Sequence, residues 1–512
     1  MLTSDFLDVI NEIERTYPVA EWRVGSLRIW PLVRIRLSHT FFDAIHALAA
    51  PGPRSAASRA SAMLAGWMRY GSARLRDHRG DAAIPEQRPT AVFLSDGVSY
   101  TRIDGRAYEK YCDPLIGRLA ASGITSLLLS PLANCPVPRH SPSVLIQPRL
   151  DRMATAAWLT AKVRRNALPS QLAGFDEAMR DVHARLSLPP FDLAQIEPRV
   201  HYVQAVARYF ERILERTGAS SAFVVAYYNL VGYAFNLACR RSGVASVDLQ
   251  HGTPGELHPA YCRWNSVPSD GYEILPAKFW CWSEPDRTAI ESSGPAFLRN
   301  HRPLLAGNVM QDDWIVGRSR AVDECDAQLR RLISSGSRPT VLLTLQPGVL
   351  SPQLRQLLLA VVRRTRGELA WWVRLHPMML DQQGEIERWL GPEGALVEEP
   401  TRLPLYGVLR HVDVHITYSS STVVEAEAFG IRSVLLSRYG QEFFPLQLRS
   451  GTALAAEEED AVVDALRRQL GIRESSDELR RRAGLRLARA DKALQELVRG
   501  YPQAGQARGA HA

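Results

Sequence analysis

The stretch VDLQHGTPGELHPAY, residues 247–261, ends an apolar run with side chains that can move a proton. Gln250, His251 and Gly252 close the run, and a second histidine, His258, follows in the same loop. An imidazole with a pKa near neutrality is the usual general base for a hydroxyl nucleophile. Gly252 would let a ligand approach the backbone closely. His251 is therefore either a general base or a structural histidine of a turn, whereas His258 is expected to be structural.

A row of hydroxyl side chains follows the apolar run DVHIT and opens the segment VVEAEAFG. Hydroxyl residues at a helix start can cap its free N–H groups, and the same groups together with the helix dipole attract phosphate. Both roles remain open for this row. One helical turn further on, the carboxylate of Glu425 could accept hydrogen bonds from ribose hydroxyls. The row comprises Ser419, Ser420, Ser421 and Thr422.

Two further polar residues close the apolar run AWWVRL: Arg374 lies at its end, and His376 follows directly before Pro377. The proline fixes the turn and would hold the imidazole rigidly; the alternative is an ordinary loop pair. An anion bound here would depend on amides, hydroxyls, Arg374 and His376, because lysine is scarce. The lysines of the chain are Lys110, Lys162, Lys278 and Lys492.

Acidic residues follow the first apolar run of the chain, in LSDGVSYTRIDGR. Asp96, Arg102 and Asp104 could line an acceptor site, or Asp96 could itself be the base. The alternative is a turn role, which Asp-Gly pairs often have. The acidic pair at 312–313 is interpreted as structural, and no required metal is predicted.

Short apolar runs that alternate with helical segments must position these side chains. Such alternation is typical of a parallel, doubly wound sheet, in which ligands bind beyond the carboxyl ends of the strands. One series runs from residue 91 and a second begins near residue 300. The expected strands are TAVFLSD, ITSLLLSP, SVLIQP, SAFVVAY, VASVDLQHG and KFWCWS in the first series, and PTVLLTLQPG, LAWWVRLHP, GALVEE, HVDVHITYSS and RSVLLS in the second, after PLLAGN.

The predicted fold class is therefore α/β, with two Rossmann-like doubly wound domains, a helical N-terminal extension and a C-terminal helix. Residues 1–16 place Phe6, Leu7, Ile10 and Ile13 on one helical face. The predicted parts are 1–90 (helical extension and basic linker), 91–300 (first Rossmann-like domain, with a helical insertion at 148–216), 301–470 (second Rossmann-like domain) and 471–512 (helix and tail).

The composition is that of a globular protein: the chain has 512 residues, of which 46% are hydrophobic. A formal net charge of +8, carried mostly by arginine, favours anionic partners such as nucleotides, phosphates or an acidic membrane surface. Nucleic acid is not expected, because no RNA-recognition, zinc-finger or helix-turn-helix signature is present. The six cysteines lie far apart and form no CxxC pair, which indicates buried thiols in a reducing compartment.

The cellular location is predicted from two features that the sequence lacks, a signal peptide and a membrane-spanning stretch. The first residues have no apolar signal-peptide core, and no stretch approaches about 20 apolar residues, so the chain is expected to be cytoplasmic. Two arginine-rich segments, 54–79 and 474–499, could lie on the inner face of the cytoplasmic membrane as salt-sensitive contacts. The alternative is that the first is a solvated surface helix or linker and that the second packs back across the domains with its arginines solvated.

The motifs LQHGTP, VRLHP and DVHITYSSSTVVEAEAFGIRSVLL together resemble the GT-B glycosyltransferase superfamily. They are most similar to bacterial surface and capsular polysaccharide biosynthesis transferases and to the related CDP-glycerol glycerophosphotransferases. The resemblance covers roughly residues 91–470. Arg374 stands where these families often have a lysine, and the first 90 residues match no part of the family pattern.

The resemblance implies a metal-independent, inverting glycosyltransferase without a cofactor. It would move a sugar from a nucleotide-activated donor to a hydroxyl of a bacterial surface polysaccharide or of a lipid-linked acceptor. The first domain would hold the acceptor, the second the donor, with a cleft between them. His251 would be the base and Glu425 the ribose contact. Arg374, His376, Ser419, Ser420, Ser421 and Thr422 would hold the donor phosphate, and Asp96, Arg102, Asp104, Gln250 and Gly252 would be candidate acceptor-site residues.

Two other functions remain open from the sequence. A nucleotide-sugar epimerase uses a similar fold and needs no acceptor. A non-catalytic cytoplasmic polysaccharide-binding protein would need no nucleotide. The sequence identifies no residue that would recognise the base of the nucleotide. The donor could therefore be a CMP-, UDP-, GDP- or dTDP-sugar or a CDP-linked polyol.

Overall fold

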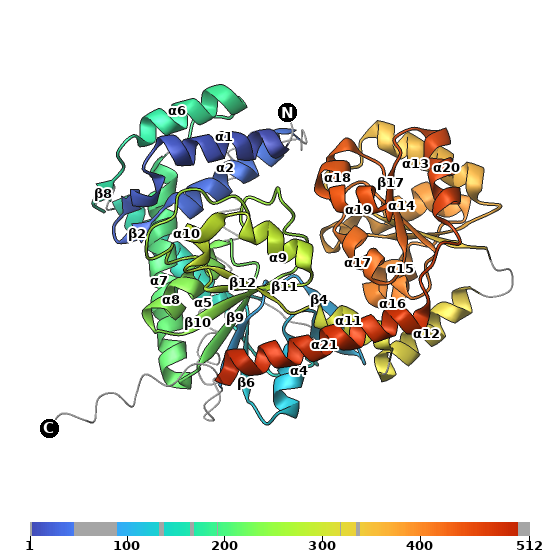
Figure 1. The fold of residues 1–512 in the computed structure, drawn as a ribbon, viewed down its shortest axis with the longest axis horizontal. Helices are drawn as coiled ribbons and strands as arrows, with labels where there is room; N and C mark the ends of the chain where they lie inside the picture. Colours follow the sequence, from blue (N-terminus) through green and yellow to red (C-terminus); the bar gives the residue numbers. More distant parts are fainter. Residues whose placement is uncertain are drawn as a thin grey trace. The chain divides into compact units, whose positions relative to one another are not determined.

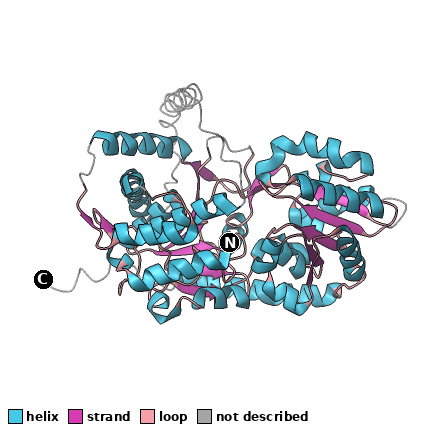
Figure 2. Ribbon diagram, turned by 90° about the horizontal axis from the view of Figure 1, so that it is seen from above, coloured by secondary structure: helices cyan, strands magenta, loops and turns pink. Residues whose placement is uncertain are grey.

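The computed structural model describes residues 3–45, 90–132, 138–163, 168–191, 193–317, 319–333 and 338–499. They form two units, shown in Figures 1 and 2. The predicted basic stretch 54–79 lies outside the described residues. The first unit takes the described residues within Met1–Tyr100, Ala107–Gly307 and Arg489–Ala512, and the second takes those within Thr101–Arg106 and Asn308–Ala488.

A seven-stranded parallel sheet forms the centre of the first unit, with the strand order β12-β11-β10-β9-β3-β6-β7. Every residue of β3, β9 and β10 is buried, as expected for strands covered by helices on both faces. The strands are β3 (Ala91–Leu94), β6 (Ser126–Ser130), β7 (Ser143–Leu145), β9 (Ser221–Val225), β10 (Ala245–Leu249), β11 (Lys278–Cys281) and β12 (Arg302–Leu305).

The helices of this unit begin and end where the sequence supplies caps. Before α8, the side chain of Asn229 accepts hydrogen bonds from the amides of Val231 and Gly232, and Gly243 follows the helix with a φ of +68°. The helices are α4 (Asp113–Ala121), α5 (Gln147–Val163), α6 (Phe175–Leu186), α7 (Ile196–Thr217), α8 (Leu230–Arg241), α9 (Glu284–Glu291) and α10 (Gly294–Leu298). The segment 148–216, predicted to be helical, corresponds to α5, α6 and α7.

The N-terminal helices α1 (Thr3–Thr16) and α2 (Trp30–Ile45) share one hydrophobic core with the seven-stranded sheet. The predicted apolar face of α1 is buried in that core, and α1 lies beside α6 (Figure 1). Three short strands, β1 (Arg23–Val24), β2 (Leu27–Arg28) and β8 (Ser170–Gln171), form a small antiparallel sheet, and β4 (Tyr100–Ile103) pairs with β5 (Arg106–Glu109).

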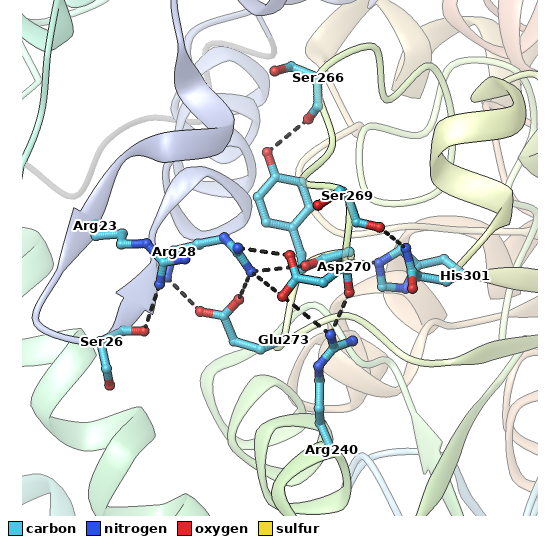
Figure 3. A network of polar contacts seen from close by, with 12 residues as sticks. Arg23, Ser26, Arg28, Arg240, Ser266, Ser269, Asp270, Glu273 and His301 are labelled. Atoms are coloured by element: carbon cyan, nitrogen blue, oxygen red, sulfur yellow. Dashed lines mark hydrogen bonds and ion pairs between the residues drawn. The ribbon is translucent and has the colours of Figure 1, made fainter.

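A polar network attaches this N-terminal segment to the chain between β10 and β11. In Figure 3, the guanidinium of Arg28 donates to the carboxylates of Asp270 and Glu273, and Arg240 reaches Asp270 from α8. The ring of His301 accepts a hydrogen bond from the Tyr272 amide at 3.1 Å in the same region. The N-terminal helices are thus part of the first unit's packing.

The second unit is built on a five-stranded parallel sheet with the order β14-β13-β15-β16-β17. Its strands are β13 (Thr340–Thr344), β14 (Ala370–Arg374), β15 (Val414–Thr417), β16 (Arg432–Leu435) and β17 (Ala453–Ala455). Its helices are α11 (Val309–Val316), α12 (Arg320–Leu332), α13 (Pro352–Thr365), α14 (Gln383–Leu390), α15 (Glu398–Arg402), α16 (Leu405–Leu409), α17 (Thr422–Ala428), α18 (Arg438–Phe443), α19 (Pro445–Ser450) and α20 (Glu459–Gln469).

The last helix, α21 (Ser476–Arg499), has the predicted helical extent and contributes to both units. Arg486 pairs with the buried carboxylate of Asp312 in the second unit at 2.6 Å. In the first unit, the Leu497 carbonyl accepts a hydrogen bond from the Ser221 hydroxyl at the start of β9, 2.7 Å away. None of the described helices is both long and apolar enough to cross a membrane.

The predicted α/β class with two doubly wound parallel sheets is confirmed, whereas one predicted strand was wrong. The run GALVEE is no strand: Leu396 makes an isolated bridge to Trp372, and α15 begins at Glu398. Its two glutamates suit the first turn of a helix, where the dipole favours negative charge. The segment PLLAGN, after which the second series of strands was expected, supplies β12, which pairs with β11 at the edge of the first sheet.

A buried histidine connects three strands of the second sheet. His415 on β15 lies between the hydroxyls of Thr344 and Ser433, at 2.9 and 3.0 Å. Burial lowers the pKa of His415 to about 3, so the ring is neutral in the folded chain. Because an unfolded histidine titrates near pH 6.5, this site favours unfolding as the pH falls from 6.5 towards 3.

We predict that the free energy of unfolding of the second unit falls by about 2 kcal/mol between pH 7.5 and pH 5 because of His415 alone. Chemical denaturation at the two pH values measures this loss. His415→Asn lowers stability at pH 7.5 but removes most of the pH-dependent loss. His376→Gln, which removes an exposed histidine of the same unit, retains that loss. An unchanged loss in His415→Asn would contradict the assignment.

Candidate functional site

His251 lies two residues beyond β10, at the carboxyl end of a central strand of the first sheet. Its Nε2 lies 3.1 Å from the hydroxyl of Tyr228, and its backbone carbonyl accepts a hydrogen bond from the Tyr111 hydroxyl at 2.9 Å. Burial lowers the pKa of the imidazole, while the charge of Asp96 and the carbonyl of Leu249 act in the opposite direction. The ring is therefore neutral near pH 7 and able to accept a proton.

The two residues that precede and follow His251 differ: Gln250 is held by hydrogen bonds, whereas Gly252 has free space beside it. The buried amide of Gln250 accepts from the Trp282 amide at 2.7 Å and donates to the Gly252 carbonyl at 2.8 Å, so Gln250 holds the turn. A Cβ atom built on Gly252 would meet no heavy atom within 4 Å. Space is thus available next to His251 for a ligand to approach the backbone.

Asp96 holds the loop after β3. Its Oδ1 accepts from the amides of Val98 and Ser99 at 2.9 Å each, Oδ2 accepts from the Ser99 hydroxyl at 2.6 Å, and Gly97 has a φ of +80°. These contacts are those of the Asp-Gly turn that the sequence offered as the alternative. Asp96 also acts electrostatically on His251, so the structure brings these two predicted residues together.

Arg102 and Asp104 lie in the hairpin formed by β4 and β5, within the part of it that belongs to the second unit. Asp104 has a φ of +50° and Gly105 one of +72°, which form the turn. The pKa of Arg320 on α12 is raised chiefly by Glu324 and to a smaller extent by Asp104. Asp104 therefore acts electrostatically on α12 of the same unit.

His258 accepts a hydrogen bond from the Ala260 amide through Nδ1, at 3.2 Å, and its ring packs against Tyr228 and Tyr261. Burial, with a contribution from His251, lowers its pKa to about 3. His258 therefore remains neutral and holds its own turn.

Sequence reasoning missed Tyr228 and Glu109. Tyr228 follows β9, the neighbour of β10, so the rule that found His251 could also have found it. Glu109 gives no such signal. It is fully buried beside Asp96 and accepts from the amides of Tyr111 and Cys112. Burial, with a contribution from the charge of Asp96, raises the pKa of Glu109 to about 8, so its carboxyl is protonated at pH 7.

In the second unit, Arg374 at the end of β14 donates through one nitrogen to the carbonyls of Pro400 and Leu403. Burial lowers its pKa to about 10, against the charge of Glu425, so the guanidinium stays cationic at pH 7. His376 is exposed and accepts from the Met378 amide through Nδ1 at 3.2 Å. Arg374 is thus a fixed buried charge, and His376 faces solvent.

The hydroxyl row forms its own network at the carboxyl end of β15. The amide and hydroxyl of Ser419 both donate to the side-chain oxygen of Gln346 at 3.1 Å. Ser420 lies 3.0 Å from the hydroxyl of Thr422 and accepts from the Thr422 amide at 3.3 Å. Ser421 precedes α17 without a side-chain cap. The predicted capping role is therefore occupied by Ser420.

Glu425 is buried on α17, and its Oε1 accepts from the Tyr406 hydroxyl at 2.8 Å. Tyr406 in turn accepts from the Asn308 amide group at 2.9 Å. Glu425 is thus bonded to Tyr406 and acts electrostatically on Arg374. Within the described ranges, no three histidine, cysteine or acidic side chains are placed to hold a metal ion.

No protein-family model matches the sequence, and the search of curated proteins returned no relative. Solved structures with a similar course of the chain include the UDP-GlcNAc 2-epimerase of Neisseria meningitidis bound to UDP-GlcNAc, at 13% identity and a TM-score of 0.47, covering 80% of this chain and 99% of that one. Another is Os79 from O. sativa in complex with UDP, at 13% identity and a TM-score of 0.49, covering 80% and 100%. The fold assignment rests on the chain's own two sheets.

We predict that Gly252→Ala leaves the thermal unfolding midpoint unchanged, because the added methyl group enters open space and Gly252 has no positive φ. The matched control is Gly232→Ala, whose methyl group would lie 2.5 Å from the backbone oxygen of Tyr227 and should cost about 1–3 kcal/mol. Thermal denaturation of both variants tests the geometry. A large loss of stability in Gly252→Ala would show that the space beside His251 is filled.

Proposed function

We propose that the chain is a metal-independent glycosyltransferase of the GT-B type, which transfers a sugar from a nucleotide-activated donor to an acceptor hydroxyl. The observation that carries this proposal is the neutral imidazole of His251 at the end of β10, beside the open backbone at Gly252. A neutral imidazole is the form of histidine that accepts a proton from a hydroxyl. The attacked anomeric carbon would belong to the donor.

The second unit supplies the groups proposed to bind the donor. As the bond to the sugar breaks, negative charge develops on the nucleotide phosphate, and a fixed cation stabilises it. Arg374 is such a cation, held by two backbone carbonyls. His376, Ser419, Ser420, Ser421 and Thr422 are the proposed phosphate contacts, and Glu425 is the proposed ribose contact.

The acceptor is proposed to be a saccharide or a lipid-linked saccharide, which would bring the protein to an anionic membrane. The arginines of α21 limit this contact, since several are already paired with acids: Arg480 with Asp477, Arg481 with Glu478, Arg482 with Glu474 and Arg486 with Asp312. Any attachment through this helix would therefore be weak and sensitive to salt.

Nucleotide-sugar epimerisation is the second candidate. It requires groups that remove a proton and return it, and the first unit holds a neutral histidine and a protonated acid, Glu109, both under the influence of Asp96. An epimerase would convert the sugar of its nucleotide donor without any acceptor.

We predict that His251→Gln lowers the turnover of sugar transfer by about 10²–10⁴-fold, the usual contribution of a general base. Binding of the nucleotide to the second unit should persist, as measured by calorimetry. Transfer is measured with radiolabelled nucleotide-sugars and a panel of saccharide acceptors. Near-normal turnover would exclude His251 as the base; conversion of the sugar without acceptor would favour the epimerase, and saccharide binding without nucleotide affinity would favour a non-catalytic protein.

We also predict that His376→Gln reduces the thermal stabilisation of the protein by its nucleoside diphosphate, because a phosphate contact is lost. A screen across nucleotides identifies the ligand, since stabilisation follows the ratio of ligand concentration to Kd. A tenfold loss of affinity lowers the stabilisation by about 1.4 kcal/mol at saturating ligand. His140→Gln, at an exposed position of the first unit, is the control. Equal stabilisation in both variants would remove His376 from the donor site.

A further inference from the structure

The proposed base has a partner that the sequence did not suggest. Nε2 of His251 and the hydroxyl of Tyr228 lie 3.1 Å apart, and the two rings are tilted by 34° at a centroid distance of 5.7 Å. The direction of this hydrogen bond decides which ring nitrogen can take up a proton. The geometry of this hydrogen bond is independent of the proposed function. Its importance for a transfer reaction rests on the proposed function.

The surroundings of the ring indicate the direction. A neutral imidazole has one N–H and one bare nitrogen. Nδ1 of His251 makes no hydrogen bond in the part of the chain described, and the Tyr228 hydroxyl bonds there to Nε2 alone. If Nε2 carried the N–H, the proton of the Tyr228 hydroxyl would have no acceptor, so the N–H of the neutral ring is placed at Nδ1. Burial raises the pKa of Tyr228, so its hydroxyl keeps its proton and donates it to Nε2.

This arrangement leaves the lone pair of the base already occupied. An acceptor hydroxyl reaches His251 either by displacing Tyr228 or by passing its proton through Tyr228. Displacement would move a side chain that the fold holds firmly. Tyr228 follows Ala226, whose φ of +56° is a strained conformation for a residue other than glycine, and precedes Asn229, which donates to the Ala226 carbonyl at 2.7 Å and caps α8.

The turn is fixed from two more sides. The Tyr227 carbonyl lies so close to Gly232 that no Cβ atom fits there, and the Tyr227 amide donates to the buried carboxylate of Asp248 at 3.0 Å. Backbone strain that the surrounding contacts maintain is common where a side chain must be aimed at a reacting group. Here the strained turn sends Tyr227 into the core and Tyr228 to His251.

We propose that Tyr228 relays the proton of the acceptor hydroxyl to His251. The acceptor oxygen forms its bond to the anomeric carbon as the bond to the leaving phosphate oxygen breaks, and the electron pair of that bond goes to the phosphate. The acceptor proton moves to the Tyr228 oxygen while the proton of Tyr228 moves to Nε2. Tyr228 is restored, His251 becomes an imidazolium, and its extra proton is later released to solvent.

Tyr228→Phe separates the two routes, because phenylalanine keeps the ring and removes only the oxygen. The relay predicts a fall in kcat of about 10²-fold or more with a smaller change in KM. Displacement predicts equal or higher activity, since Nε2 is then free, and that result would overturn the relay. Tyr111→Phe is the matched control: it removes a hydroxyl bonded to the backbone of the same histidine and should cost less than about tenfold.

A second measurement is independent of activity. In protein with ¹⁵N-labelled histidine, the signal of His251 is identified by its absence from the spectrum of His251→Gln. The relay requires a protonated Nδ1 and a bare Nε2 near pH 7; a protonated Nε2 would overturn it whatever the enzyme does. If His251→Gln is inactive and Tyr228→Phe active, the relay alone fails. If both variants transfer sugar normally, the proposed base fails with it.

Discussion

One buried ion pair holds the first unit together around the loop that bears His251. The guanidinium of Arg34 on α2 meets the carboxylate of Glu14 on α1, and both side chains are fully buried. Separating a buried charge from its partner typically costs about 3–5 kcal/mol, so the two helices must stay in register. The pair also bonds to the loop: Arg34 donates to the carbonyls of Cys262 and Arg263, and Glu14 accepts from the Asn265 amide.

The loop depends on such contacts because it contains no regular structure between the end of β10 and the start of β11. A connection of this length inside a sheet domain must satisfy its backbone groups through side chains. Tyr261 donates to the buried carboxylate of Asp248, and Trp264 donates to the Ala260 carbonyl while its ring lies under Arg34, 4.2 Å from the guanidinium carbon. An N-terminal segment without any catalytic motif therefore fixes the surroundings of the candidate base.

The sequence predicts the sheets well because buried parallel strands are short apolar runs, and ten of the eleven expected runs contain a strand. GALVEE failed because its apolar centre, Leu396, is followed by two glutamates that favour a helix start. The turn at Asp96 and the position of His251 were also readable, since both follow a strand. Tyr228 also follows a strand and was missed although the same rule applies to it. Glu109 and the Arg34–Glu14 pair give no such signal, because their surroundings form only through packing and no spacing rule reports them.

The order in which the chain is made gives α21 a particular significance. Residues 489–499 belong to the first unit. There the carbonyls of Leu497 and Val498 accept from Ser221 at the start of β9 and from Ser220 just before it, and Asp491 pairs with Arg118. During synthesis the first unit must wait, after Gly307, for the roughly 180 residues that precede Arg489, or about 10–40 s at 5–20 residues per second. Until then Ser220, Ser221 and Arg118 lack these partners, so the first unit completes its packing only after the second unit has been made.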